Sequence, residues 1–171
     1  MSTISTGIIT TPLGEMHIGV SKKGVCFLEF ENKARVENHI NTLSRDHKIV
    51  EEQSNKIIQQ TQTEINQYFN KALVTFTVPL DFVGTDFQCA VWNALLDIPF
   101  GQTRTYLDQA KTIGDVKAIR AVATANGKNR IAIIVPCHRV IGSDGSLTGY
   151  AGELWRKKKL LELESNQGSL F

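Results

Sequence analysis

The sequence predicts an α+β protein, with a small N-terminal α/β domain that contains an antiparallel sheet and a mostly helical C-terminal domain. Residues 6–30 alternate short β-prone runs with turn residues, whereas residues 86–126 carry apolar residues at helical spacing. Residues 71–85 between them contain Pro and Gly and have neither pattern. Because 171 residues suffice for two small domains, we predict a boundary that separates domains 1–83 and 84–171.

The N-terminal half is predicted to contain a meander, a helix, a strand and a second helix, in this order. Turn residues at Pro12–Gly14 and Lys22–Gly24 separate the β-prone runs. The polar stretch 31–44 is predicted to be helical, and residues 47–52 to add a strand. Residues 54–70 place Ile and Phe at helical spacing. Nothing in this half suggests chemistry.

The C-terminal half is predicted to contain a helix-turn-helix. Residues 86–98 form the first expected helix, and residues 104–114 form a shorter one that ends at a glycine. Asp115 stands at an N-cap position before the helix expected over 116–126, and Gly127 at its C-cap position. Two short helices joined by a tight turn that contains glycine give the outline of a helix-turn-helix.

The second helix of this pair is poor in bulky side chains. Its small residues are Ala118, Ala121, Ala123 and Ala125, and Arg120 is a long cation among them. One interpretation is a helix packed closely in a core. The other is a helix whose backbone approaches a narrow groove, with contacts that depend on shape and backbone more than on base sequence. Both interpretations stay open at this point.

Composition and charge limit the possible functions. The chain is 42% hydrophobic and 21% charged, as in globular proteins, and no apolar run approaches the roughly 20 residues of a membrane span. Three widely spaced cysteines and scattered histidines predict neither a disulfide framework nor a metal site. Residues 1–84 contain 8 basic and 9 acidic residues and residues 85–171 contain 11 and 8, so the small positive surplus lies in the second half.

The stretch IAIIVPCHRV, residues 131–140, indicates nucleophilic chemistry. We expect residues 131–135 to form a buried strand that presents Cys137 and His138. A thiol with an ordinary pKa of about 8.5 needs a base or a cation nearby to ionise at neutral pH. Glu164 lies on the leucine-bearing face of the C-terminal helix, where a carboxylate needs a partner, and can orient the imidazole. The alternatives are a solvated Glu164 and a thiol that only packs in the core, as expected for Cys26 and Cys89.

The sequence PCHRV, with Asn129 upstream and GSDGSLTGYAG downstream, resembles the active-site signature of the O6-alkylguanine–DNA alkyltransferases. The resemblance extends from about residue 84 to residue 164, about half of the chain, and the first half fits the family's variable N-terminal domain by position and character. It implies DNA repair by a single, irreversible transfer of a methyl or other alkyl group from guanine O6 in double-stranded DNA to Cys137, without a cofactor. O4-alkylthymine stays open as a second substrate. A monomer with no membrane association is expected, cytoplasmic in a bacterium or archaeon and nuclear in a eukaryote.

The resemblance also implies roles for individual residues. Cys137 would accept the alkyl group, His138 would take its proton through a water molecule, Glu164 would hold the tautomer of His138, and Asn129 would tie the helix-turn-helix to the cysteine loop. The residues implied in binding the flipped base are Tyr106, Val140, Tyr150, Ala151 and Gly152. Those implied in binding DNA are Arg120, as the finger that fills the gap left by the base, Tyr106 and Ser143.

Three positions depart from the family pattern. Arg130 stands where many relatives have proline, Ala151 where some have serine, and Glu153 where glycine is frequent. The zinc ligands of some relatives cannot be assembled here from Cys26. Two other functions remain as alternatives. A cysteine hydrolase or acyl transferase would regenerate its thiolate in each cycle, and a DNA-binding module without chemistry would not need Cys137.

Overall fold

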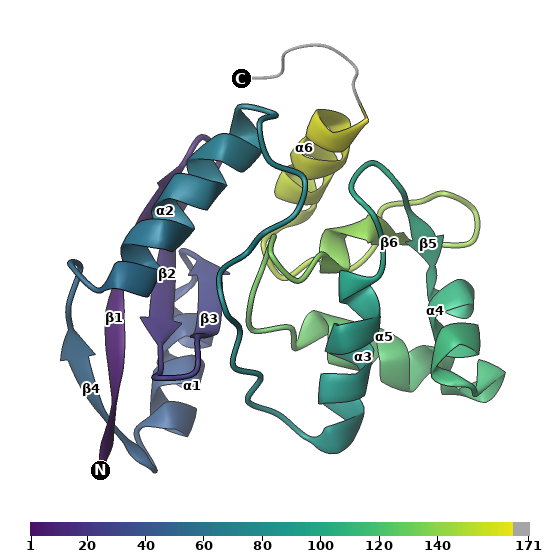
Figure 1. Ribbon diagram of the computed structural model, residues 1–171. Helices are drawn as coiled ribbons and strands as arrows, with labels where there is room; N and C mark the ends of the chain where they lie inside the picture. Colours follow the sequence, from purple (N-terminus) through teal and green to yellow (C-terminus); the bar gives the residue numbers. More distant parts are fainter. Residues whose placement is uncertain (166–171) are drawn as a thin grey trace. The chain divides into compact units, whose positions relative to one another are not determined.

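The computed structural model describes residues 1–165. The chain divides into two compact units, one of Met1–Val83 and one that begins at Gly84. A sheet with two helices forms most of the first unit, and helices dominate the second (Figure 1). The predicted α+β class is confirmed.

The first unit is built on a four-stranded sheet with the order β3-β2-β1-β4. β1 (Ser2–Thr11), β2 (Gly14–Val20) and β3 (Val25–Phe30) form the expected antiparallel meander. β4 (His47–Glu51) is the additional strand, and it pairs with β1 in parallel. The sheet is therefore antiparallel except at this edge.

Two helices complete the first unit. α1 (Lys33–Leu43) begins after Asn32 and α2 (Lys56–Phe69) after Asn55, and in both cases the Asn side chain accepts hydrogen bonds from backbone N–H groups of the first turn. Figure 1 shows α2 in front of the sheet and α1 behind it. The sheet is thus covered on both faces, which explains why every residue of β3 is buried.

The second unit contains four α-helices in its described part: α3 (Asp86–Leu96), α4 (Tyr106–Ile113), α5 (Ile119–Gly127) and α6 (Leu154–Glu164). Two two-residue strands, β5 (Arg104–Thr105) and β6 (Val140–Ile141), pair in parallel. Thr85 and Thr105 begin α3 and α4 with capping boxes.

α4 and α5 form the predicted helix-turn-helix (Figure 1). α4 ends at Gly114, whose φ of 98° lies in the left-handed region that glycine tolerates. Asp115 caps a short 3₁₀ turn, Val116–Ala118, so α5 starts three residues later than the sequence predicts. The side-chain amides of Gln109 in α4 and Asn126 in α5 exchange two buried hydrogen bonds of 2.8 and 2.6 Å. This pair fixes the two helices against each other.

The small residues of α5 serve two faces of the helix. Ala125 is buried, and its carbonyl accepts a 2.9 Å hydrogen bond from the Trp92 indole of α3. Ala121 and Arg120 are exposed on the other side. The interpretation of a closely packed helix therefore holds for the face that carries Ala125, and the face that carries Arg120 and Ala121 is exposed.

The prediction of a strand over residues 131–135 is wrong. The five residues are buried but form a compact turn, in which the Val135 N–H donates to the Ile131 carbonyl at 3.1 Å. Ile133 has a φ of 69°, which is strained for a β-branched residue. An unbroken apolar run indicates burial on all sides but does not distinguish a buried strand from a buried turn.

Candidate active site

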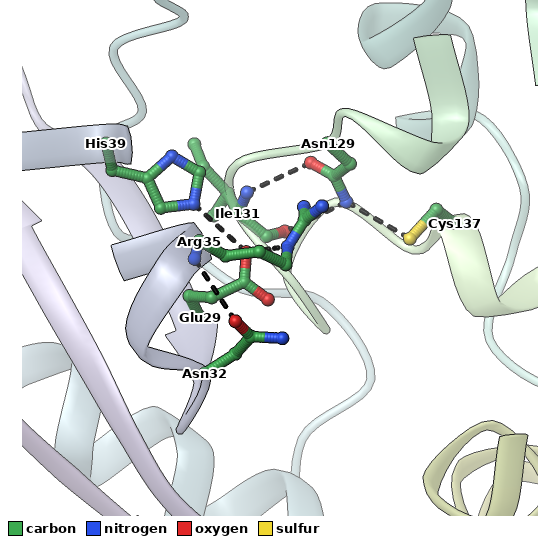
Figure 2. A network of polar contacts seen from close by, with 7 residues as sticks. All are labelled: Glu29, Asn32, Arg35, His39, Asn129, Ile131 and Cys137. Atoms are coloured by element: carbon green, nitrogen blue, oxygen red, sulfur yellow. Dashed lines mark hydrogen bonds and ion pairs between the residues drawn. The ribbon is translucent and has the colours of Figure 1, made fainter. Parts of the chain in front are cut away.

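The Asn129 side chain organises the turn that precedes the cysteine. Its Oδ1 accepts from the Ile131 N–H at 3.0 Å, and its Nδ2 donates to the Val135 carbonyl at 2.9 Å. The same Nδ2 lies 3.2 Å from the Cys137 Sγ (Figure 2). An N–H donor directed at sulfur favours the thiolate over the thiol. One amide thus supports the strained turn and contacts the candidate nucleophile.

Cys137 begins a 3₁₀ turn, η2 (Cys137–Arg139), directly after Pro136. The thiol is half-buried, whereas the next residue, His138, is fully buried. Adjacent side chains on a strand point to opposite faces, but in this turn they need not. The turn therefore leaves the sulfur accessible and encloses the imidazole.

His138 is bound to the α6 carboxylate that the sequence singles out. Its Nε2 lies 2.7 Å from Glu164 Oε2, with both side chains buried. Because a carboxylate accepts hydrogen bonds, this contact places the imidazole proton on Nε2 and leaves Nδ1 as a base. Within residues 1–165, the buried Nδ1 has no hydrogen-bond partner. This nitrogen is the atom that can take a proton from a thiol through water.

The protonation states of this pair follow from burial and charge. Burial lowers the pKa of His138 below its ordinary value and outweighs the opposing effect of Glu164, so the imidazole is neutral at pH 7. Burial by itself would raise the pKa of Glu164, but His138 and Arg139 outweigh it and hold that pKa well below its usual range. The site therefore contains a carboxylate and a neutral base.

Arg139 is a site residue that the sequence analysis missed. Its Nε and Nη2 donate to the two oxygens of Glu164 at 2.7 and 3.1 Å, and its Nη1 donates to the Ile98 carbonyl at 2.7 Å. This bidentate pair neutralises a carboxylate that burial would otherwise destabilise. A buried Glu164 requires a cation, but the sequence does not indicate that Arg139 is this cation.

Tyr106 reaches the loop that follows the cysteine turn. Its hydroxyl donates to the Thr148 carbonyl at 3.2 Å and lies 3.8 Å from the position that a Cβ on Gly149 would take. Burial raises the pKa of Tyr106, and the Cys137 thiolate raises it further. The phenol is therefore protonated at neutral pH and can act as a proton donor.

The other residues predicted to bind the base lie in β6, which contains Val140, and in the segment between β6 and α6. The Val140 carbonyl accepts a 2.6 Å hydrogen bond from the Lys157 Nζ, and the Gly152 carbonyl accepts a 3.2 Å bond from Arg156 Nη1. Tyr150 and Ala151 are half-buried. Val140 and Gly152 are thus held in place by contacts with α6.

The structure does not bring Arg120 and Ser143 into contact with the thiol. Arg120 is exposed on α5, and within the described residues its side chain makes no hydrogen bond or ion pair. Ser143 is exposed in the turn closed by the hydrogen bond from the Gly142 N–H to the Ser146 carbonyl. Both lie on the surface, where a large partner can reach them.

Glu153 shows why glycine is frequent at its position. Its φ of 77° lies in the left-handed region, where a side chain is strained. The carboxylate accepts a 2.7 Å hydrogen bond from the Trp155 indole, which holds it at the start of α6. Arg130, the other charged departure, is half-buried.

Residues 1–165 contain neither a cluster of metal-ligating side chains nor a candidate membrane span. This part of the chain contains no group of three or more His, Cys, Asp or Glu side chains arranged to hold a metal ion. It also contains no helix with the length and apolar character that a membrane span requires.

Comparison with known proteins gives matches along both halves of the chain. Residues 86–166 match the family model described as 6-O-methylguanine DNA methyltransferase, DNA binding domain, and residues 4–82 match that of the ribonuclease-like domain. A methylated-DNA–protein-cysteine methyltransferase of Methanosarcina barkeri is 43% identical over 160 residues, which is 93% of this chain and 96% of that protein. The protein of the same name from Mycobacterium tuberculosis is 58% identical over 104 residues, 61% of this chain and 63% of its own length.

Solved structures agree with these matches. The Mycobacterium tuberculosis OGT in complex with DNA has a TM-score of 0.82 at 40% identity, and the match covers 97% of this chain and 96% of that one. The structure of the O6-methylguanine methyltransferase from the same organism has a TM-score of 0.77 at 38% identity, and the match covers all of this chain and 97% of that one.

The fold and the site define an α+β protein in which a helix-turn-helix unit carries a half-buried cysteine beside a carboxylate-bound histidine. The relatives share this fold along nearly the whole chain. The chain belongs to the methylated-DNA–protein-cysteine methyltransferase family.

Proposed function

We propose that this protein repairs DNA by transferring a methyl or larger alkyl group from guanine O6 to Cys137, once per molecule and without a cofactor. The observation that supports this most is the chain of contacts from Asn129 to the sulfur and from His138 to Glu164. It supplies a thiolate-favouring donor and a buried neutral base for an accessible thiol. Family membership supports the choice of substrate.

The proposed reaction begins with the thiol. Its proton passes through water to Nδ1 of His138, and the ionised Glu164 stabilises the imidazolium. The sulfur then forms a bond to the alkyl carbon as the bond from that carbon to guanine O6 breaks. The Tyr106 hydroxyl gives a proton to the leaving guanine and is later reprotonated from His138 through water. The product is a thioether, which has no easy route back to a thiolate.

The proposed DNA contact uses α5 and its neighbours. A base inside a stacked duplex is out of reach of Cys137, so the damaged nucleotide must leave the stack. Arg120 would fill the gap, Tyr106 would guide the nucleotide, and Ser143 would contact the backbone. The base would be received by Val140, Tyr150, Ala151 and Gly152. The exposed small residues of α5 suit close approach to a minor groove with little sequence preference.

The roles of the two domains and the setting belong to the same proposal. Residues 84–171 form the alkyltransferase and DNA-binding domain, and residues 1–83 form the N-terminal domain. The protein acts as a monomer in the compartment that holds the DNA, which is the cytoplasm in a bacterium or archaeon and the nucleus in a eukaryote. The relative with bound DNA supports the choice of partner.

The test separates transfer from binding. Cys137→Ser should abolish transfer from a duplex that contains O6-methylguanine, because serine is a far weaker nucleophile, while affinity for the same duplex is retained. Cys89→Ser, at a half-buried thiol of α3, is the matched control and should transfer normally. Methyl transfer by Cys137→Ser, or an equal loss of transfer in both variants, would refute the assignment.

A further inference from the structure

The strand β1 is longer than the strand β4 that pairs with it at the edge of the sheet. β4 pairs with β1 from Ser2 to Thr6, and the Glu52 N–H donates to the Thr6 carbonyl at 2.9 Å just beyond it. Residues 7–11 of β1 extend past this point. Every second residue of a strand directs its N–H and C=O groups to the same edge, so Ile8 and Thr10 present theirs on the edge that β4 leaves open.

Two glutamine side chains occupy this part of the edge. Gln53 Oε1 accepts a hydrogen bond from the Ile8 N–H at 2.7 Å, and Gln53 Nε2 donates to the Ile8 carbonyl at 2.9 Å. Gln62 makes the same pair of hydrogen bonds with Thr10, at 2.8 and 2.9 Å. Because a primary amide carries a donor and an acceptor, each side chain takes the place of a residue in a neighbouring strand.

Other residues of the first unit hold both glutamines in this position. The Gln53 carbonyl accepts a 2.7 Å hydrogen bond from Gln59 Nε2 on α2. Gln62, also on α2, donates from its Nε2 to Asn66 Oδ1 at 2.9 Å. Gly7 leaves room for the Gln53 amide, because a Cβ at this position would lie 2.6 Å from its Oε1. The positions of the two amides are therefore set by contacts with β1 and α2.

The strand under these glutamines has the composition of a segment that pairs with copies of itself. Residues 2–11, STISTGIITT, are rich in β-branched residues and contain no charged residue and no proline. On an open edge such a segment is prone to pair with another strand. β4 carries Lys48 and Glu51, and charged side chains oppose such pairing. Beyond β4, the edge of β1 has only the two glutamines to oppose it.

The open edge would fit β1 of a second copy of this chain. In an antiparallel pair centred on Ile9, Ile8 of each copy would lie opposite Thr10 of the other. Both N–H···O bonds can then form at each of these pairs. They would use the same backbone groups that Gln53 and Gln62 occupy within one chain. Such a pair has two-fold symmetry, which is the commonest symmetry of dimers.

We propose that the edge of β1 over residues 7–11 is a self-association surface for β1 of a second copy, and that Gln53 and Gln62 keep it closed. The two glutamines compete successfully with a second copy because they belong to the same molecule, which gives their amides a high effective concentration at the edge. The inference goes beyond the proposed function, since it concerns the first unit and involves no DNA.

The experiment measures molecular mass by sedimentation velocity over a series of protein concentrations. Gln53→Ala/Gln62→Ala should form a dimer at concentrations at which the wild-type protein is a monomer, because the backbone groups of Ile8 and Thr10 lose their partners within the chain. The N–H groups of both residues should exchange with solvent more rapidly than in the wild-type protein when this variant is dilute, and more slowly once it dimerises. Gln67→Ala, at an exposed glutamine of α2, is the matched control and should stay monomeric.

Thr10→Pro, added to the double variant, identifies the surface that pairs. Proline removes the N–H of this residue and cannot take part in the ladder, so the triple variant should be a monomer. A dimer that persists in the triple variant, or a folded double variant that is monomeric at every concentration, would overturn the inference. If the double variant does not fold, Gln62→Ala alone opens the edge at Thr10 and should still dimerise, at higher concentration. Repair of O6-methylguanine is not measured here, so failure of the proposed function would leave these results unchanged.

Discussion

Each of the two units contains a Glu–His–Arg cluster around a buried carboxylate. In the first unit, Oε2 of Glu29 lies 3.0 Å from both Arg35 Nε and His39 Nε2 (Figure 2). The second unit has the same residue types with shorter contacts, because Glu164 lies 2.7 Å from both its histidine and its arginine. By residue type alone, either cluster could serve a catalytic cysteine.

The difference lies in the environment of each cluster. The His39 ring stacks on Phe27, with 5.2 Å between centroids. Cys26, which lies in the same strand as Phe27, is buried, and burial raises the pKa of its thiol to about 11. In the second unit the thiol adjoins the histidine and is half-buried. A carboxylate-bound imidazole is therefore a structural element by itself, and an accessible neighbouring thiol gives it a chemical role.

The largest difference between the two clusters is expected in the transfer rate when the carboxylate of each cluster is replaced in turn. Glu164→Gln should lower the single-turnover rate of methyl transfer about 100-fold or more, because His138 loses the group that orients it and stabilises its charged form. Glu29→Gln should leave the rate per folded molecule unchanged. Both variants should lose stability, by about 3–5 kcal/mol where a buried cation is left unpaired. Rates normalised to the folded fraction, measured by circular dichroism, test this contrast.

Equal loss of rate in both variants would break the distinction between the two clusters. Unchanged transfer in folded Glu164→Gln would show that the second cluster is structural as well. Glu162→Gln, at a more exposed carboxylate of α6, is the matched control for Glu164→Gln.

A smaller effect is expected from removal of one exposed arginine in each unit. Arg120→Ala should slow repair of duplex DNA about tenfold, which corresponds to about 1.4 kcal/mol, while reaction with free O6-benzylguanine is nearly unchanged. Arg45→Ala, at an exposed arginine of the first unit, should change neither rate. Equal decreases with both substrates in Arg120→Ala would contradict the finger role.

The pH dependence of stability should reveal the second cluster. The pKa of His138 is lowered in the folded state, so below about pH 6.5 the unfolded chain binds more protons than the folded one. The free energy of unfolding therefore decreases as the pH decreases through this range. The lowered pKa of Glu164 adds stability that is present above about pH 4.5 and is lost as pH falls further. Melting temperatures at pH 7, 5.5 and 4 should therefore decrease in this order. A melting temperature that is unchanged or rises from pH 7 to pH 4 would contradict these directions.

The smallest effect is expected at the cysteine of the first unit. Cys26→Ala removes one buried sulfur and should cost about 1 kcal/mol of stability, with transfer unchanged. In the wild-type protein, iodoacetamide at pH 8 should not label Cys26 on the timescale on which it labels Cys137, because burial raises the pKa of Cys26. Rapid labelling of Cys26 in the folded protein would contradict this comparison.

The sequence predicts much of this fold because most elements carry a period or a cap. The amphipathic helix over residues 54–70 and the turn at Gly114 are recognisable from local pattern. The apolar run 131–135 has no period, so its turn could not be predicted. Its conformation depends on Asn129, whose side chain replaces the hydrogen bonds of a sheet.

The pairing of the buried charged residues near Cys137 could be predicted from the sequence only in part. Glu164 is recognisable because a carboxylate on a leucine face needs a partner. Lys157 lies on the same helix, but lysine is so commonly exposed that its position predicts no burial. Arg139 directly follows the Cys-His pair, yet nothing in the local pattern marks it as the counter-ion of Glu164. Burial of a long cation is a tertiary property that local pattern does not reveal.

The central claim is that Cys137 forms one permanent carbon–sulfur bond. Incubation of the protein with an excess of duplex that contains O6-methylguanine, followed by intact-mass and peptide mass spectrometry, tests it most directly. We expect one methyl group per protein molecule, located on the Cys137 peptide, and no further repair after one equivalent. Continued turnover, as a cysteine hydrolase or acyl transferase would show, or a methyl group on Cys26 or Cys89 would contradict the account.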